Sequence, residues 1–156
     1  MTNIKYKVCG PMNTHFIRNL ILKLDISESV SYLRKHRYLV ENYHISQWST
    51  KGFVFAYSNQ LKKLEWHGWL TLIDSIHKTN QYNWCLFTLY ICDTYRCWSV
   101  GTHFFVSNED ADTVAEALII IYNKYYNWSL HYILSDQSSI EAKSIKKAFP
   151  NITANE

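Results

Sequence analysis

The chain has 156 residues, of which 47% are hydrophobic, and carries a formal net charge of +3. This length suits one ordinary domain with an extension, and the mild positive charge permits contact with a polyanion without demanding it. No apolar run reaches membrane-spanning length, and no apolar segment follows a basic start, so we expect neither membrane contact nor a signal peptide. The four cysteines form no C-x-x-C pair and match no zinc-site spacing, which favours a reduced, intracellular protein of the nucleus or cytoplasm.

Residues 1–67 are predicted to form a mainly helical extension. The elements expected here are helices over 16–24, 27–37 and 59–66 and one strand over 51–57. The basic cluster at 34–37 fits a solvated helix face better than a phosphate contact. Strand-forming residues become frequent after Gly68, which places a domain boundary near residue 67.

Residues 68–150 are predicted to follow the order β-β-β-α-β-α, with a polar tail over 151–156. The expected elements are strands over 69–74, 83–92 and 97–106, a helix over 109–126, a strand over 131–134, and a helix that starts at Ser138 or Ser139 and stops before Pro150. A turn at 93–96 makes the second and third strands a hairpin. The long helix then crosses over, so the fourth strand can lie parallel to the first.

Two aspartates occupy matched positions in this scheme. Asp74 ends the first strand and Asp136 follows the fourth. Either one alone fits a turn-forming residue, but neighbouring parallel strands would release both at the same end of the sheet. Close like charges repel, a divalent cation relieves the repulsion, and oxygen ligands favour Mg²⁺ or Mn²⁺. Metals held about 4 Å apart by such groups support phosphodiester cleavage. We therefore predict a metal site at Asp74 and Asp136.

Three ordered segments resemble the catalytic domain of Mutator-like element (MULE) transposases. Leu72-Ile73-Asp74-Ser75-Ile76-His77-Lys78-Thr79-Asn80 is similar to the first-acid motif. Ile133-Leu134-Ser135-Asp136-Gln137-Ser138, with Glu141-Ala142 and Ala148-Phe149-Pro150, is similar to the second-acid motif, and residues 106–110 fit the link between strand and helix. The resemblance covers about residues 50–150. It implies a ribonuclease H-like α/β fold with a mixed sheet, and DDE-type cleavage and strand transfer of DNA with Mg²⁺. It also implies that Asp74 and Asp136 are the catalytic, metal-binding acids and that Lys78 binds DNA.

The chain departs from this family in two ways. Ile76 stands where the family usually has Thr. The third acid is expected on a later helix, beyond Glu156, and we gave neither Glu141 nor Glu156 that role. The resemblance therefore implies a truncated transposase domain that lacks the last strand and helix, binds metal weakly and is inactive alone. The missing strand would leave residues 132–134 as an exposed sheet edge, through which we expect self-association into a homo-oligomer.

Other readings stay open. A non-catalytic DNA- or protein-binding module derived from the same element is the main alternative, and a gene fragment without function is a third. We expect His77 to be a loop histidine rather than a ligand, and Asp93, Glu109 and Asp110 to be turn and cap residues. The remaining candidates are expected to have no functional role. Trp66, Trp69, Tyr82 and Trp84 are expected to be core aromatics, and Cys85, Cys92 and Cys97 to be buried and unreactive. Lys143, Lys146 and Lys147 are expected to form a solvated helix face.

Overall fold

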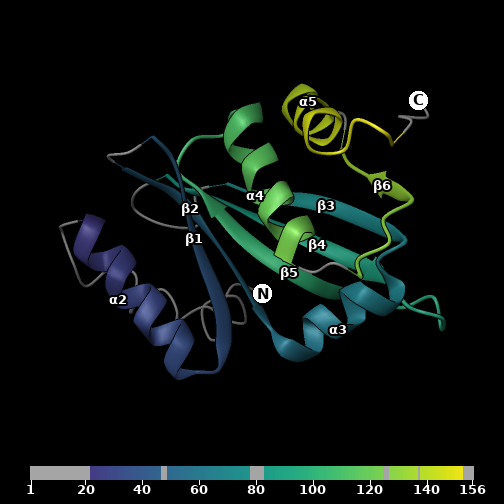
Figure 1. The fold of residues 1–156 in the computed structure, drawn as a ribbon, viewed down its shortest axis with the longest axis horizontal. Coiled ribbons are helices and arrows are strands. Elements are labelled where there is room, and N and C mark those ends of the chain that lie inside the picture. Colours follow the sequence, from purple (N-terminus) through teal and green to yellow (C-terminus); the bar gives the residue numbers. More distant parts are fainter. Residues whose placement is uncertain (1–21, 47–48, 78–82, 125–126, 137, 153–156) are drawn as a thin grey trace, which may run out of the picture.

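A six-stranded mixed sheet with helices on both faces forms the protein (Figure 1). The computed structural model describes residues 22–46, 49–77, 83–124, 127–136 and 138–152. In chain order the elements are α2 (Leu22–Lys35), β1 (Tyr38–Ser46), β2 (Ser49–Tyr57), α3 (Ser58–His67), β3 (Leu70–Ile76), β4 (Cys85–Cys92), β5 (Trp98–Val106), α4 (Ala111–Lys124), β6 (Tyr132–Leu134) and α5 (Ser139–Ala148). The order of strands across the sheet is β1-β2-β5-β4-β3-β6.

The second half of the chain has the predicted topology. Strands β3, β4 and β5 form an antiparallel meander, and α4 then crosses over to β6. Strand β6 runs parallel to β3, with Leu70 opposite Tyr132 and Leu72 opposite Leu134. The predicted order β-β-β-α-β-α and the parallel pairing of the first and fourth strands are therefore confirmed.

The first half differs from its prediction in three respects. One strand was expected and there are two, because β1 pairs antiparallel with β2, which pairs with β5. Glu41, Asn42 and His44 interrupt the apolar pattern of β1, which explains why the sequence did not show it. The sheet thus continues across the boundary expected near residue 67. Helix α2 also runs through Asp25, where a helix end was predicted, while most of the helix expected over 16–24 lies outside the described residues.

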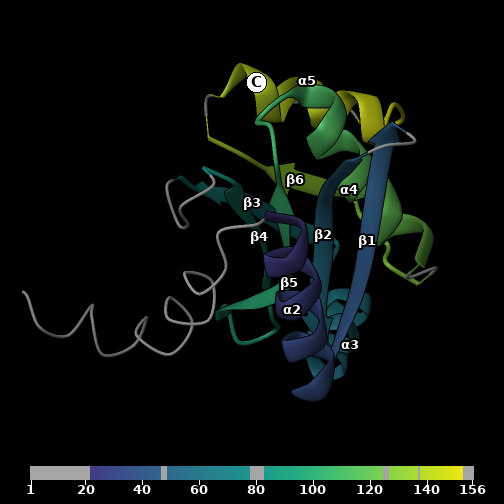
Figure 2. The ribbon, with the colours of Figure 1, turned by 90° about the vertical axis from the view of Figure 1, so that its left-hand side faces the viewer.

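Two apolar cores lie on opposite faces of the sheet. Figure 2 shows α4 and α5 on one side and α2 on the other. The larger core packs α4, α5 and the 128–130 segment against one face of the sheet. The strands contribute Ile73, Phe87, Leu89 and Phe104, and the segments that cover them contribute Leu118, Ile121, Trp128 and Phe149. The smaller core packs α2 against the other face through Val30, Leu33, Val40, Phe53, Phe55, Trp84 and Phe105. The alternation of side chains along each strand explains how one sheet supplies both cores.

The aromatic and cysteine predictions hold only in part. Trp84 is buried as expected, but the side chains of Trp66 and Trp69 are 68% and 48% exposed. Tyr82 lies outside the described residues. Cys85 is buried, whereas Cys97 is exposed because β5 begins one residue after it.

The acids expected to shape turns do so. The Asp110 carboxylate accepts hydrogen bonds from the Asp112 and Thr113 backbone N–H groups, at 3.1 and 2.8 Å, and from the Thr113 hydroxyl at 2.8 Å. It therefore satisfies donors that the first turn of α4 leaves free. The Asp93 carboxylate accepts from the Tyr95 and Cys97 backbone N–H groups, both at 2.9 Å, and closes the β4–β5 turn.

Strand β6 forms one edge of the sheet. Within the described part of the chain it pairs with β3 alone, and Tyr132 and Leu134 are about half exposed. Helix α2 lies beside the opposite edge, so it does not cover β6 (Figure 1). The exposed edge agrees with expectation, and self-association through it stays a prediction. Among the helices that the structure describes, none is both long and apolar enough to cross a lipid bilayer.

Candidate functional site

Asp74 and Asp136 lie toward the same end of two neighbouring parallel strands, although β3 continues to Ile76 and does not end at Asp74 as predicted. Leu72 of β3 lies opposite Leu134 of β6, and each aspartate comes two residues after its leucine. Asp74 is half-buried within β3, and Asp136 is exposed just after β6. The sheet register thus brings together two acids that are 62 positions apart in the sequence, as the sequence analysis expected.

A third carboxyl group, that of Glu141, lies within the electrostatic reach of both aspartates, with Asp136 acting on it more strongly than Asp74. The negative charges of Asp136 and Asp74 both act on it, and it accepts hydrogen bonds from the Ser75 side chain and the Asp136 backbone N–H. Its side chain is only 3% exposed. The Oε2 atom is buried without a hydrogen-bond partner. An unpaired buried carboxylate oxygen is costly, and it is the kind of group that a cation or a proton satisfies.

The electrostatics of Glu141 follow from this placement. Burial raises the pKa of its carboxyl group above the ordinary value, and the charges of Asp136 and Asp74 raise the pKa further. The hydrogen bonds from Ser75 and from the Asp136 backbone oppose this shift because they stabilise the charged form. A cation bound among the three carboxyl groups would remove the repulsion that raises the pKa.

Glu141 was not expected at the site, although its place in the sequence carries a local signal for it. Ser138 caps α5 and its side chain accepts from the Glu141 backbone N–H, so Glu141 lies in the first turn of the helix. A helix that begins directly after β6 keeps its first turn near the end of that strand. The family resemblance instead implied a third acid beyond Glu156.

Ile76 and Lys78 are neighbours of Asp74 in the first-acid motif, and the structure describes only the first of them. The side chain of Ile76, in place of the family's Thr, is 47% exposed at the end of β3. Lys78, the expected DNA contact, lies outside the described residues. Of the α5 lysines, Lys143 and Lys146 are exposed as predicted, and Lys147 pairs with Asp112.

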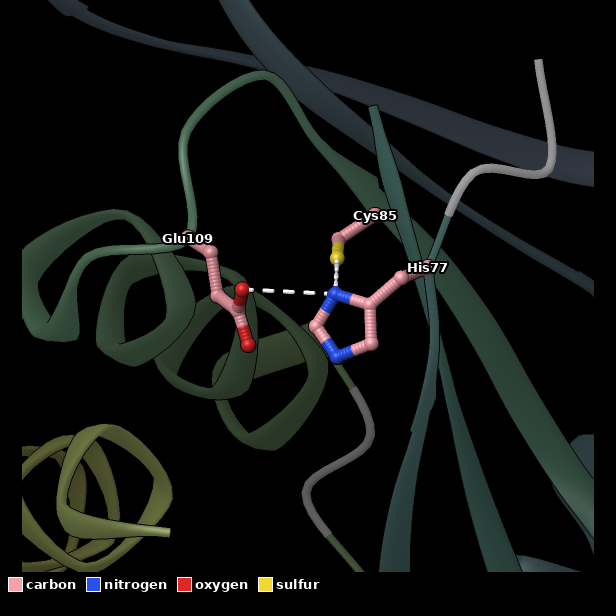
Figure 3. Close-up of side chains that lie close together, drawn as sticks. All are labelled: His77, Cys85 and Glu109. Atoms are coloured by element: carbon pink, nitrogen blue, oxygen red, sulfur yellow. Dashed lines mark hydrogen bonds and ion pairs between the residues drawn. The ribbon is translucent and has the colours of Figure 1, made fainter. Parts of the chain in front are cut away.

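His77 has closer contacts than its prediction as a loop histidine implied. Figure 3 shows its ring between the Cys85 thiol and the Glu109 carboxylate. The Nδ1 atom lies 3.0 Å from the Cys85 Sγ and 3.4 Å from a Glu109 Oε2 atom. Glu109 therefore contacts His77 as well as preceding helix α4.

A half-buried histidine, His103, lies in the same row of the sheet as Asp74. Cross-strand pairing sets Asp74 opposite Thr88, and Thr88 opposite His103. The Thr88 hydroxyl and the His103 Nδ1 are 2.9 Å apart, and the His103 ring stacks on Phe55. Burial lowers the pKa of His103 to about 4, so this imidazole is neutral at physiological pH.

Comparison with known families identifies one match. Residues 31–155 match the family model described as the RNaseH-like domain of zinc finger SWIM domain-containing protein 1/3. The match takes in every strand of the sheet and helices α3, α4 and α5. It agrees with the ribonuclease H-like α/β fold that the sequence predicted. Comparisons with curated proteins and with solved structures gave no match.

Proposed function

Because the chain belongs to the RNaseH-like domain family of zinc finger SWIM domain-containing protein 1/3, we propose that it is a transposase-derived domain for metal-dependent phosphodiester chemistry on DNA. The resemblance of residues 72–80 and 133–138 to MULE transposase motifs supports the transposase origin. The observation that carries the proposal is the buried, unpaired Glu141 Oε2, on which the charges of Asp136 and Asp74 both act.

In this proposal Asp74, Asp136 and Glu141 bind Mg²⁺ or Mn²⁺. Three carboxylates on rigid elements fit a hard cation, which takes oxygen ligands and relieves their mutual repulsion. When bound, such a cation supplies Lewis-acid polarisation of a phosphoryl oxygen and lowers the pKa of a bound water. Strand β3 holds Asp74, the segment after β6 holds Asp136, and α5 holds Glu141 within hydrogen-bond reach of Ser75. Lys78 would contact the DNA backbone from the same motif as Asp74.

We expect the Asp136→Asn variant to bind Mn²⁺ at least about tenfold more weakly than wild type, a loss of about 1.4 kcal/mol of binding free energy. The amide keeps the shape of the side chain but removes one negative ligand. Isothermal titration calorimetry gives the affinity, and paramagnetic broadening of backbone amide NMR signals by Mn²⁺ gives the location. Signals from the segments around Asp74, Asp136 and Glu141 should broaden first. The Glu141→Gln variant should lose affinity as well.

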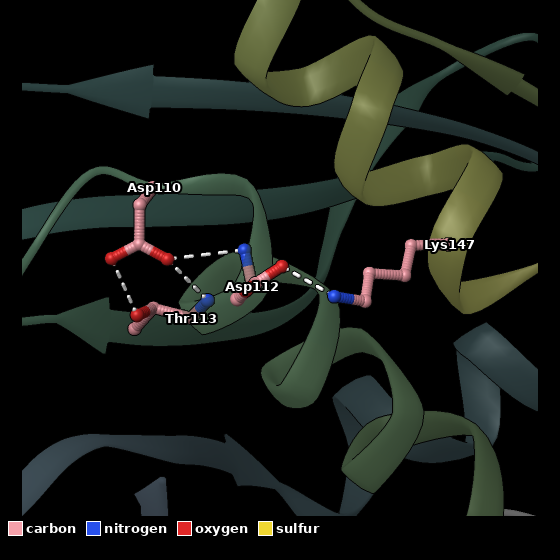
Figure 4. A network of polar contacts seen from close by, with 4 residues as sticks. All are labelled: Asp110, Asp112, Thr113 and Lys147. Atoms are coloured by element: carbon pink, nitrogen blue, oxygen red, sulfur yellow. Dashed lines mark hydrogen bonds and ion pairs between the residues drawn. The ribbon is translucent and has the colours of Figure 1, made fainter.

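A matched control for this experiment is Asp112→Asn. Asp112 is an exposed acid at the start of α4, and its carboxylate pairs with Lys147 rather than facing the three acids (Figure 4). This variant should bind Mn²⁺ like wild type. Equal Mn²⁺ affinity of wild type and Asp136→Asn, or broadening confined to another part of the protein, would count decisively against the proposed site.

The second candidate function is DNA binding without catalysis, and the charge distribution favours it. The net charge is +3, and the exposed Lys143 and Lys146 lie on α5, the helix that carries Glu141. We expect duplex DNA affinity that falls steeply with salt and is retained in Asp74→Asn, since backbone contacts release counterions and need no metal. Fluorescence anisotropy at several salt concentrations measures it, with Lys143→Gln/Lys146→Gln expected to reduce the salt dependence. Plasmid nicking that requires Mg²⁺ and that Asp136→Asn abolishes would instead support metal-dependent cleavage over DNA binding alone.

A further inference from the structure

His77, Cys85 and Glu109 come together at one end of the sheet from three neighbouring strand ends. Antiparallel pairing puts Ile76 of β3 opposite Leu86 of β4, so the next step along both strands brings His77 to Cys85. Cys85 in turn lies opposite Val106, the last residue of β5, and Glu109 follows three residues later. The backbone therefore fixes where these three side chains start, and Figure 3 shows them pointing toward one another.

Hydrogen bonds to the His77 ring cannot satisfy Cys85 and Glu109 at the same time. The same atom, Nδ1, lies 3.0 Å from the Cys85 Sγ and 3.4 Å from the Glu109 carboxylate. A ring nitrogen carries either one proton or one lone pair, so it cannot accept from the thiol and donate to the carboxylate at once. A cation in the middle would engage all three groups together.

We propose that His77, Cys85 and Glu109 form a binding site for a borderline-soft divalent cation of the Zn²⁺ class, distinct from the carboxylate site at Asp74 and Asp136. The three ligand atoms all lie within 4.8 Å of one another. Zinc bond lengths in tetrahedral geometry place nitrogen and oxygen ligands about 3.4 Å apart and nitrogen and sulfur ligands about 3.6 Å apart. The observed separations of 3.4 and 3.0 Å need a shift of only about half an ångström to admit the ion.

The ligand set decides which metal this site takes. Thiolate and imidazole favour Zn²⁺ over Mg²⁺, whereas three carboxylates favour Mg²⁺ or Mn²⁺. Three protein ligands also leave a fourth tetrahedral position for water or another ligand. The side chains of His77 and Glu109 are 54% and 33% exposed, so solvent reaches that position. The two sites are thus distinguishable by metal preference alone.

A different role for Cys85, as a nucleophile activated by His77, fits the site less well. Burial, together with the charge of Glu109, raises the pKa of the Cys85 thiol to about 11. The thiol is therefore protonated at neutral pH, and a protonated thiol is a poor nucleophile. Coordination to a cation would displace that proton, as it does for thiol ligands generally.

Cobalt binding to the full chain tests this site. Co²⁺ substitutes for Zn²⁺ in such sites and gives a thiolate-to-metal charge-transfer band in the near ultraviolet when a cysteine is a ligand. We expect wild type to show the band, Zn²⁺ to erase it by competition, and Cys85→Ser to lack it. Cys97→Ser, which removes an exposed thiol at the far turn, should retain the band, as should Asp136→Asn.

A second variant keeps the test independent of folding. His77 is half exposed, so His77→Ala should leave the circular dichroism spectrum and thermal midpoint unchanged while weakening Zn²⁺ binding at least about tenfold, or about 1.4 kcal/mol. Absence of the band in wild type, its retention in Cys85→Ser, or unchanged Zn²⁺ affinity in His77→Ala would each overturn the proposal.

Discussion

Replacement of Trp128 by alanine is expected to lower the free energy of unfolding by about 3–5 kcal/mol, the range for deletion of a large buried aromatic side chain. Trp128 is 2% exposed, and its indole ring packs against Tyr122 and Phe149. Its Nε1–H donates a hydrogen bond of 2.9 Å to the Gly68 carbonyl. Because domains of this size are stable by only about 5–15 kcal/mol, the loss is a large fraction of the total. Urea denaturation followed by circular dichroism measures it.

Two further variants separate the sources of this stability. Trp128→Phe keeps most of the ring but removes the N–H donor, and a loss of about 1–3 kcal/mol is expected. The loss is smaller because the Gly68 carbonyl still accepts from the Thr71 hydroxyl at 3.0 Å. Trp66→Ala removes a tryptophan that is 68% exposed and should change stability by less than about 0.5 kcal/mol. Equal effects of Trp128→Ala and Trp66→Ala would contradict this account of the core.

Acidification is expected to destabilise the protein through His103. Burial lowers the pKa of the folded-state imidazole to about 4, whereas the unfolded chain titrates near its ordinary value of about 6.5. Between these values the unfolded state binds a proton that the folded state does not, so stability falls as the pH drops from about 6.5 toward 4. From pH 7 to 4.5 this single group should cost the wild type about 2–3 kcal/mol.

The His103→Gln variant isolates this contribution from other titrating groups. Glutamine has no proton to gain in this range, so the stability difference between wild type and variant should shrink by about 2–3 kcal/mol between pH 7 and pH 4.5. Urea unfolding at several pH values measures the difference, with the exposed His131→Gln as the control. A difference that is constant with pH would show that His103 is protonated equally in both states.

The fold of the second half could be predicted from its local patterns, as could β2 and α3 of the first half, which match the strand expected over 51–57 and the helix expected over 59–66, but β1 could not. Strand β4, Cys85–Cys92, is an apolar run interrupted only by Thr88, so its type is evident from eight residues. Strand β1 includes Glu41 and Asn42, and it becomes a strand by pairing with β2 across a hairpin. Its stability comes from that partner and from α2, neither of which is a local property of its sequence.

The reason why position 68 requires a glycine is visible only in three dimensions. A Cβ atom built there would lie 2.2 Å from the Leu64 carbonyl oxygen and 2.4 Å from atoms of the Trp128 ring. Its backbone φ of −72° is open to any residue, so the requirement for glycine is steric and not conformational. The sequence marked Gly68 as the start of a strand-rich region, but the ring that excludes a side chain comes from 60 positions away.

The sequence alone predicted the order of elements around Asp74 and Asp136, because that order depends on short apolar runs, caps and turns that each segment carries within itself, and the resemblance to MULE transposase motifs implied the ribonuclease H-like fold. Only the tertiary structure decided that Glu141 is buried near Ser75 and within the electrostatic reach of Asp136 and Asp74, and that His77 meets Cys85 and Glu109. Both groupings depend on strand register and on where α4 and α5 pack. Charge repulsion, burial and ligand geometry act between atoms that are close in space, and distance along the chain does not report them.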